Sequence, residues 1–250
     1  MLNVYTKSGR SCIALLMLLG FALLCGGGCQ PYAQGRSAEE LLSLSISGLA
    51  GVDQYSFTGK TVIRNAAGVQ TPPVIFQGKV EDHHNIKVQS SEKTYIDHFA
   101  SQPLALLKKI QAGKAKVEVV GAKSGQSTAV LRIEMDPSKA RRIWQDQLTA
   151  SMNEVEKKLD PAKAERSLQP LQQSSKEAYL KEWKAELDHS KKQLEKMLGS
   201  LQVESVYELT IDRKRLLPLK LDEQTLLHYE VDGNKLKEGR KAEMTFAPSG

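Results

Sequence analysis

The sequence predicts an α+β fold in which a curved antiparallel sheet packs on helices. Apolar and polar residues alternate with a period of two both before residue 136 and after residue 205. Between these two regions, residues 137–200 have helical periodicity. The segments that connect consecutive strands are of hairpin length, which is too short for the crossovers that parallel strands require. We therefore expect one sheet, with a long helical hairpin inserted between its strands.

The first expected element is a helix over residues 38–50. Ser37 precedes it and Glu40 follows three residues later, which is the spacing of a capping box. Apolar residues then recur at helical spacing, and Gly48 or Gly51 is suited to end the helix.

A meander of short strands is expected next. Tyr55 and Phe57 share one face of the first strand, and Phe76 lies on the apolar face of the second, so each strand is half buried. The turn-forming stretches NAAG and DHHN separate the strands. The strands are expected at residues 55–64, 74–81, 86–88 and 93–97.

A second short helix is expected over residues 102–112, because Pro103 falls in its first turn, where proline is tolerated. Two strands, at residues 116–120 and 128–135, follow this helix. The loop AKSG joins them as a hairpin.

The helical insertion begins at Asp136-Pro137, because aspartate is a good N-cap and proline fits the first helical position. Two apolar stripes follow at a spacing of three or four residues, which is the pattern of a helix that packs on a partner helix. They consist of Trp144, Leu148, Met152, Val155 and Leu159, and of Leu180, Trp183, Leu187, Leu194, Met197 and Leu201. We interpret residues 137–200 as a helical hairpin or a three-helix excursion, in which Trp144 and Trp183 face each other.

Strands return after the insertion and complete the same sheet. Alternating apolar residues predict them at residues 206–212, 217–231 and 242–246. The polar stretches DRKRLLP and DGNKLKEGR are expected to form the turns between them.

The N-terminus has the order of a secretory leader. Lys7 and Arg10 precede the apolar run IALLMLLGFALL, whose 12 residues are fewer than the roughly 20 of a spanning helix. Cys25 and three glycines follow, and then Cys29. This order resembles the lipobox of bacterial lipoproteins, although the family usually has leucine where this chain has Gly26. Cys25 is the worse candidate for lipidation, because the leucine directly before it is too large. A plain signal peptide and an uncleaved signal anchor are the alternatives.

The resemblance implies a domain organisation and a location. Residues 1–28 would be removed as a signal peptide, and Cys29 would carry the acyl groups that anchor the protein to the membrane. Residues 29–37 would form a tether, and residues 38–250 a single domain with its insertion at about 137–200. The protein would then lie on the outer, extracytoplasmic face of the cell membrane.

The sequence contains only weak matches to the motifs that are typical of enzymes. Ser90 and Lys93 match the S-x-x-K motif, but at a junction of strands rather than on a helical turn. Asp82, His83, His84 and His98 could ligate a metal only by converging in the fold, and exposed turn residues are the favoured interpretation. We expect no catalytic residue, metal or cofactor. The net charge of +6, without a dense basic block among aromatics, also argues against a nucleic-acid partner.

The element order resembles that of the LolA/LppX-like superfamily of exported lipid-binding proteins, with DQYSFTGKTVI and VYELTIDRKRLLPLKL as the nearest stretches. The resemblance implies a curved sheet that binds a lipid or another apolar ligand. The residues expected to line such a site are Tyr55, Phe57, Phe76, Trp144 and Trp183. The alternative is an envelope adaptor that contacts a protein partner through the hairpin at 137–200.

Overall fold

The computed structural model describes residues 35–83, 85–91, 102–158 and 173–248, and Ser37–Gly250 belong to one compact unit. The predicted strand at 93–97 lies outside the described residues. The helices and strands are α2 (Ala38–Ala50), β1 (Tyr55–Arg64), β2 (Val74–Glu81), β3 (Asn85–Ser90), α3 (Pro103–Gly113), β4 (Lys114–Val119), the short 3₁₀ turn η1 (Gly121–Lys123), β5 (Thr128–Met135), α4 (Pro137–Lys158), α6 (Gln173–Ser200), β6 (Gln202–Asp212), β7 (Leu217–Val231) and β8 (Asn234–Pro248).

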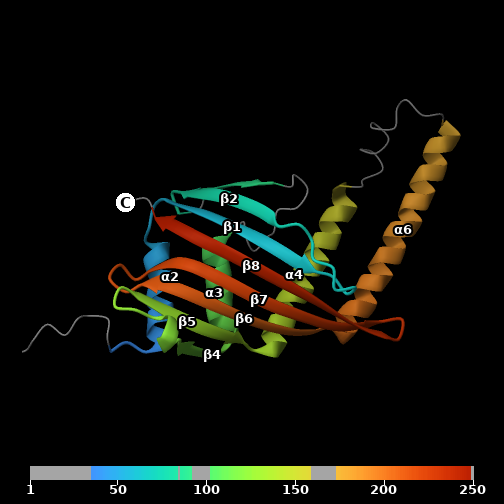
Figure 1. Cartoon of the computed structure of the whole chain (residues 1–250). Helices are drawn as coiled ribbons and strands as arrows, with labels where there is room; N and C mark the ends of the chain where they lie inside the picture. The colour runs from blue at the N-terminus through green and yellow to red at the C-terminus, as the bar shows by residue number, and fades with distance from the viewer. Residues whose placement is uncertain (1–34, 84, 92–101, 159–172, 249–250) are drawn as a thin grey trace, which may run out of the picture. The chain divides into compact units, whose positions relative to one another are not determined.

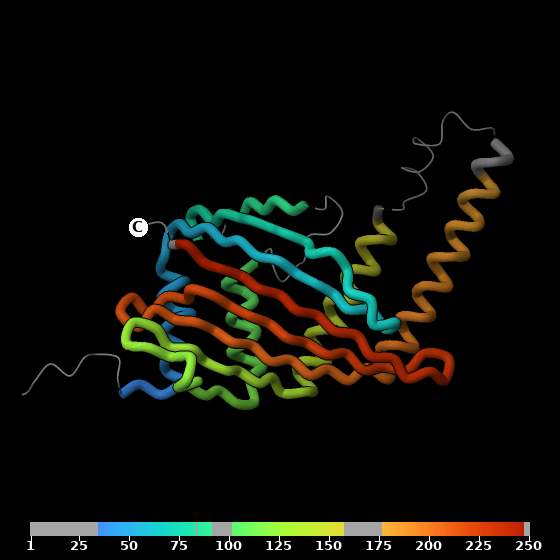
Figure 2. Tube along the Cα trace, viewed as in Figure 1, coloured from blue at the N-terminus to red at the C-terminus, as the bar shows by residue number. Residues whose placement is uncertain are grey.

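The strands form one eight-stranded sheet in the order β3-β2-β1-β8-β7-β6-β5-β4, and every pair is antiparallel. Two meanders, β1 to β3 and β4 to β8, meet where the first strand pairs with the last, so that the light-blue β1 and the red β8 lie side by side in Figure 2. The helices lie on one face of this sheet, and α4 and α6 are inserted between β5 and β6 (Figure 1). The predicted α+β class and the inserted helical hairpin are confirmed.

The core lies between the sheet and the helices. Alternate residues of each strand point toward the helices, and the buried side of α2 packs against β4, β7 and α3. Ser37 caps this helix as expected, since its Oγ accepts a hydrogen bond from the backbone N of Glu40 at 3.1 Å. Close packing also requires Gly48, because a Cβ there would lie 2.5 Å from the carbonyl oxygen of Leu216 in the β6–β7 turn.

The last strand is much longer than the sequence indicated. β8 begins at Asn234 rather than at residue 242, so that only Asp232 and Gly233 form the turn that had been expected over 232–240. This prediction was wrong because LKEGRK is polar on both faces. The segment forms a strand because it pairs with β7 on one side and β1 on the other, although its sequence does not alternate between apolar and polar residues.

The two inserted helices rest on the sheet, α4 on β6 and α6 on β7. Near the sheet, polar contacts join them: Arg141 donates to the carbonyl oxygens of Leu198 and Gly199 at 3.3 and 3.1 Å. Farther out, Lys191 pairs with Glu156 at 2.7 Å. In the outer part of the two helices, the side chains that were expected to pack between them are half buried or exposed. This part of the helices projects past the sheet (Figure 1).

Candidate functional site

Three of the five residues expected to line a ligand site lie in the packed core. Tyr55, Phe57 and Phe76 are each at most 5% exposed. The ring of Phe57 lies over Gly78 on the neighbouring strand, where a Cβ would come within 2.3 Å of the ring, and Phe76 lies over Gly59 in the same way. Each aromatic ring therefore fills the space that its glycine partner leaves, and these rings help to close the β1–β2 end of the core.

The two tryptophans do not face each other. Trp144 of α4 is buried, and the guanidinium of Arg240 lies 5.4 Å from the centroid of its ring. Trp183 of α6 is 37% exposed and stacks on Tyr179 of the same helix at 6.2 Å between centroids. The expected pairing across the hairpin was wrong, because α4 turns its tryptophan toward the sheet rather than toward α6.

A hollow of about 420 Å³ lies between α3 and α4, and we call it the α3–α4 hollow. Its apolar lining comes from Ala105 and Leu106 of α3 and from Ile143 and Ala150 of α4. Its volume falls within the range of roughly 300–1,000 Å³ that is typical of small-molecule sites. None of the five expected lining residues borders it, although Ile143 is the sequence neighbour of Trp144.

Polar groups of the α3–α4 hollow are contributed by Gln102, Lys109, Asp146, Gln147 and Glu154. The Oε1 atom of Gln147 is buried and has no hydrogen-bond partner within the part of the chain that the structure describes. A buried acceptor without a partner is costly, by about 1–3 kcal/mol, so a donor group on a bound molecule would be favoured there. The hollow thus combines an apolar lining with polar groups, which suits an amphiphilic ligand.

A second group of functional interest is a buried ion pair, which lies on the helix-facing side of the sheet. Glu223 Oε2 of β7 and Arg240 Nη2 of β8 are 3.2 Å apart, and their side chains are 3% and 4% exposed. Thr225 Oγ1 donates to Glu223 Oε1 at 2.8 Å and lies 2.9 Å from Ser205 Oγ. Because a threonine hydroxyl carries one proton, Ser205 must be the donor in the second bond, and the chain of hydrogen bonds ends on the carboxylate.

This ion pair was not predicted from the sequence, although the sequence indicated the position of one partner, Glu223. The alternation in LDEQTLLHY places Glu223 and Thr225 on the same face as Leu221 and Leu227, which are buried. A charged residue in the register of the core therefore indicated a buried partner. Arg240 could not be found in this way, because it falls in the stretch that was expected to be a turn.

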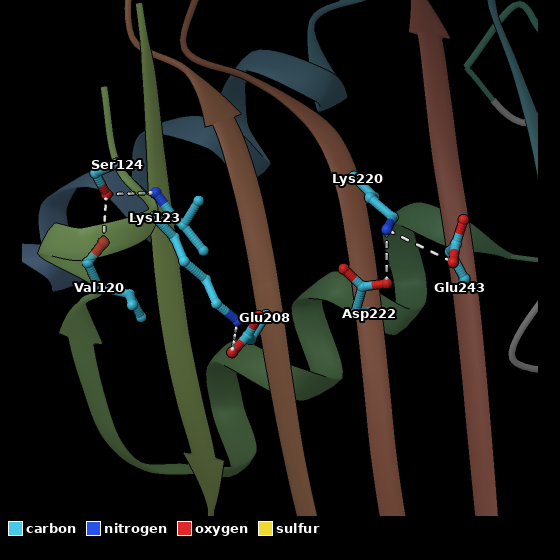
Figure 3. Close-up of polar contacts among 8 residues, drawn as sticks. Val120, Lys123, Ser124, Glu208, Lys220, Asp222 and Glu243 are labelled. Carbon is cyan, nitrogen blue, oxygen red and sulfur yellow. Dashed lines mark hydrogen bonds and ion pairs between the residues drawn. The ribbon is translucent and has the colours of Figure 1, made fainter. Parts of the chain in front are cut away.

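The opposite face of the sheet is covered by exposed ion pairs. Lys220 Nζ lies 3.0 Å from Asp222 and 3.5 Å from Glu243, and Lys123 Nζ lies 2.7 Å from Glu208. Figure 3 shows these side chains on the side of the strands away from the helices. Such pairs contribute little to stability because water and salt screen them, so this face is a solvated surface.

The described residues give little support for metal or nucleophile chemistry. They contain no group of three or more potential metal ligands. His83 lies in the β2–β3 turn, where its Nε2 atom is 2.8 Å from an Asp53 carboxylate oxygen. His84, His98 and Lys93 lie outside the described residues, as does Cys29. The S-x-x-K motif and the four residues weighed as metal ligands therefore lie only partly within the described residues.

None of the described helices has the length and apolar composition needed to cross a membrane. No protein-family model matches the chain, and no curated protein matches it either.

Proposed function

We propose that this protein is a lipoprotein held at the outer face of the cell membrane through acylated Cys29, and that it binds an amphiphilic ligand such as a lipid. The observation that supports ligand binding is the α3–α4 hollow, with its apolar lining and the unpartnered Gln147 Oε1 atom among the described residues. The order of basic residues, short apolar run, glycines and cysteine supports the anchor.

The mode of binding differs from the one that the sequence suggested. The apolar part of the ligand would occupy the space between two helices rather than the space under β1 and β2, where Phe57 and Phe76 are packed on glycines. Its polar part would contact Gln147 and the charged residues Lys109 and Asp146. The resemblance to the LolA/LppX-like superfamily agrees with such a ligand and remains a prediction.

Ligand binding is tested by filling the hollow. Ala150 lines it on α4, and Ala150→Trp would place a large ring in the space. Ala185→Trp adds the same ring at an exposed position of α6 and is the matched control. The full chain is purified in a neutral detergent, and co-purified lipid is counted per protein by mass spectrometry. The ratio should fall for Ala150→Trp alone, and equal ratios in all three proteins would overturn the proposal.

The anchor is tested separately through Cys29. Cys29→Ala should release the protein from the membrane fraction or leave it unprocessed, and it should abolish labelling with an alkyne fatty acid. Cys25→Ala is the control, since this residue would be removed with the leader. Wild-type fractionation and labelling of Cys29→Ala would contradict the lipoprotein assignment.

The projecting part of the hairpin supports a second candidate function, which is contact with a protein partner. Val155 of α4 and Trp183 of α6 belong to the apolar stripes but are 47% and 37% exposed, and Tyr179, which stacks on Trp183, is 47% exposed. Large apolar side chains gathered on projecting helices are typical of interaction surfaces. The partner would contribute an apolar helix face, because the stripes have the spacing of helix packing.

Photocrosslinking tests this contact. A photoreactive amino acid at position 183 should crosslink to one defined band in cells, whereas the same amino acid at exposed Lys184 should give much less of that band. Crosslinking of equal strength and pattern from both positions would indicate a surface without a specific partner.

A further inference from the structure

We propose that the face of the sheet away from the helices carries a binding site for a phosphate-bearing ligand, in a basin centred on Gly239. The basin has a volume of about 630 Å³ and is bordered by the cations Arg64, Lys237 and Lys241. It is separate from the α3–α4 hollow, because it lies on the other side of the sheet. It therefore does not depend on the function proposed above.

Strand register brings the three cations together around a residue without a side chain. Arg64 of β1 lies directly opposite Gly239 of β8, and Lys237 and Lys241 are two residues away on either side. Diagonal neighbours of this kind are about 7–8 Å apart, within reach of long side chains. The three side chains project to the same face because they share the alternation of the strands. Gly239 leaves the floor between them open.

These three cations differ from most of the other cations on the same face. Seven cations there have a carboxylate oxygen between 2.7 and 3.4 Å away: Lys60, Lys79, Lys87, Lys116, Lys123, Arg132 and Lys220. By contrast, no carboxylate lies at ion-pair distance from Arg64, Lys237 or Lys241 among the described residues. Within the described part of the chain, three cations without an ion pair thus lie together at the basin, whereas most other cations on this face are paired with a carboxylate.

The acidic residues that border the basin cancel only part of this charge, because one of them faces the helices and the other leaves three cations against one carboxylate on this face. Glu238 lies on the helix-facing side, where it forms a hydrogen bond with Tyr229. Glu204 is on the same face as the cations, but its strand is three strands away from that of Arg64. Strands are spaced by about 4.8 Å, which places the two backbones roughly 14 Å apart. At 0.1 M salt the Debye length is about 10 Å, so Glu204 has little effect on Arg64.

The donors of the basin favour phosphate over a single carboxylate. A guanidinium binds phosphate through two parallel hydrogen bonds, and lysine binds it as a point charge. Asn65, Gln70 and Gln224 add side-chain amides at the border. A phosphate group has enough oxygens to accept from three cations at once, whereas a carboxylate has two. The matching chemistry is that of a phosphate ester, either on a soluble molecule or on a lipid headgroup.

An adjoining hollow provides room for the rest of such a ligand. It has a volume of about 390 Å³ and shares Val62, Val206 and Lys241 with the basin. Val62 and Val206 lie at opposite ends of one row across the sheet, with Lys241 and Gln224 between them. A ligand larger than phosphate would therefore extend over β6 to β8 from its anchored anionic group.

The experiment is a titration of the full chain in a neutral detergent with two probes, inorganic pyrophosphate and dihexanoyl phosphatidylglycerol. Dihexanoyl phosphatidylcholine serves as a zwitterionic reference. Arg64→Gln removes one cation, and Gly239→Glu places a carboxylate at the centre, where a Cβ meets no atom closer than 3.6 Å. Lys87→Gln removes an exposed cation that is already paired with Glu81 at 3.0 Å and is the matched control.

We expect saturable binding of at least one anionic probe that weakens with added salt. Arg64→Gln should raise its Kd about tenfold or more, since hydrogen bonds to charged groups contribute about 1.5–3 kcal/mol. Gly239→Glu should abolish binding, and Lys87→Gln should change the Kd less than twofold. Preference for pyrophosphate would identify a soluble phosphate ester, and preference for phosphatidylglycerol a headgroup. Absence of saturable binding, or equal losses in Arg64→Gln and Lys87→Gln, would overturn the proposal.

Discussion

Glu223→Gln should strongly destabilise the fold, because it leaves the buried guanidinium of Arg240 without its counter-charge. The amide keeps the shape of the carboxylate, so the substitution changes charge rather than packing. The side chains of Glu223 and Arg240 are 3% and 4% exposed, which prevents water from replacing the lost interaction. The structure also offers a matched control, since the neighbouring Asp222 forms an exposed pair with Lys220 at 3.0 Å on the other face of β7.

The magnitude follows from the 3.2 Å separation of the two charged atoms. At an effective dielectric constant of about 20, their attraction is about 5 kcal/mol, most of which is offset by the loss of hydration. Removing one partner leaves the other charge buried, so the free energy of unfolding should fall by about 3–5 kcal/mol. For the exposed pair, Asp222→Asn should lower it by less than about 1 kcal/mol.

The assay is urea-induced unfolding followed by tryptophan fluorescence. In a Trp183→Phe background, Trp144 is the single tryptophan, and it reports on the ion pair because Arg240 lies over its ring. With an m-value of about 3 kcal/mol/M, Glu223→Gln should lower the midpoint by about 1–2 M urea. Asp222→Asn should shift it by less than about 0.3 M.

A double replacement separates the burial of an unpaired charge from the value of the pair itself. Glu223→Leu combined with Arg240→Met removes both charges, and the protein should regain most of the lost stability. Equal and small shifts for Glu223→Gln and Asp222→Asn would refute the reasoning. A double variant as unstable as Glu223→Gln would refute it as well, because packing rather than charge would then be responsible.

Two further predictions concern a close contact and a helix cap. Gly48→Ala should lower the free energy of unfolding by about 1–3 kcal/mol, because the new Cβ would approach the carbonyl oxygen of Leu216 to 2.5 Å. In the control Gly199→Ala, no atom lies within 4 Å, so thermal denaturation should show stability unchanged or raised by up to about 1 kcal/mol. At the start of α4, hydrogen bonds from Ser138 and the backbone of Lys139 lower the pKa of Asp136. A lowered pKa means that this stabilisation is present at neutral pH and is lost as the pH falls below about 4, so Asp136→Asn should show a smaller loss of melting temperature on acidification.

The candidate sites differ in how far the sequence could predict them. The burial of Glu223 could be predicted, because this acidic residue lies in the inward register of an otherwise apolar face. The α3–α4 hollow was not, since its linings come from helices that are adjacent only in the folded chain. The Gly239 basin depends on a strand that begins at Asn234, within a stretch whose composition indicated a turn. Of the aromatic residues expected at a ligand site, Phe57 and Phe76 pack on glycines, Tyr55 and Trp144 are buried, and Trp183 is 37% exposed on α6.

Local patterns in the sequence predict the α+β class, the order of the described elements and the inward face of most strands. These properties depend on local periodicity and on capping residues, which any short window of the chain contains. Only the folded chain shows that Arg240 meets Glu223, that Trp144 turns to the sheet and that Arg64 lies opposite Gly239. Each of these contacts joins residues that are distant in sequence or belong to different elements, and their meeting depends on strand register and helix packing. The energy of such contacts is set by burial and by partners, neither of which a local pattern contains.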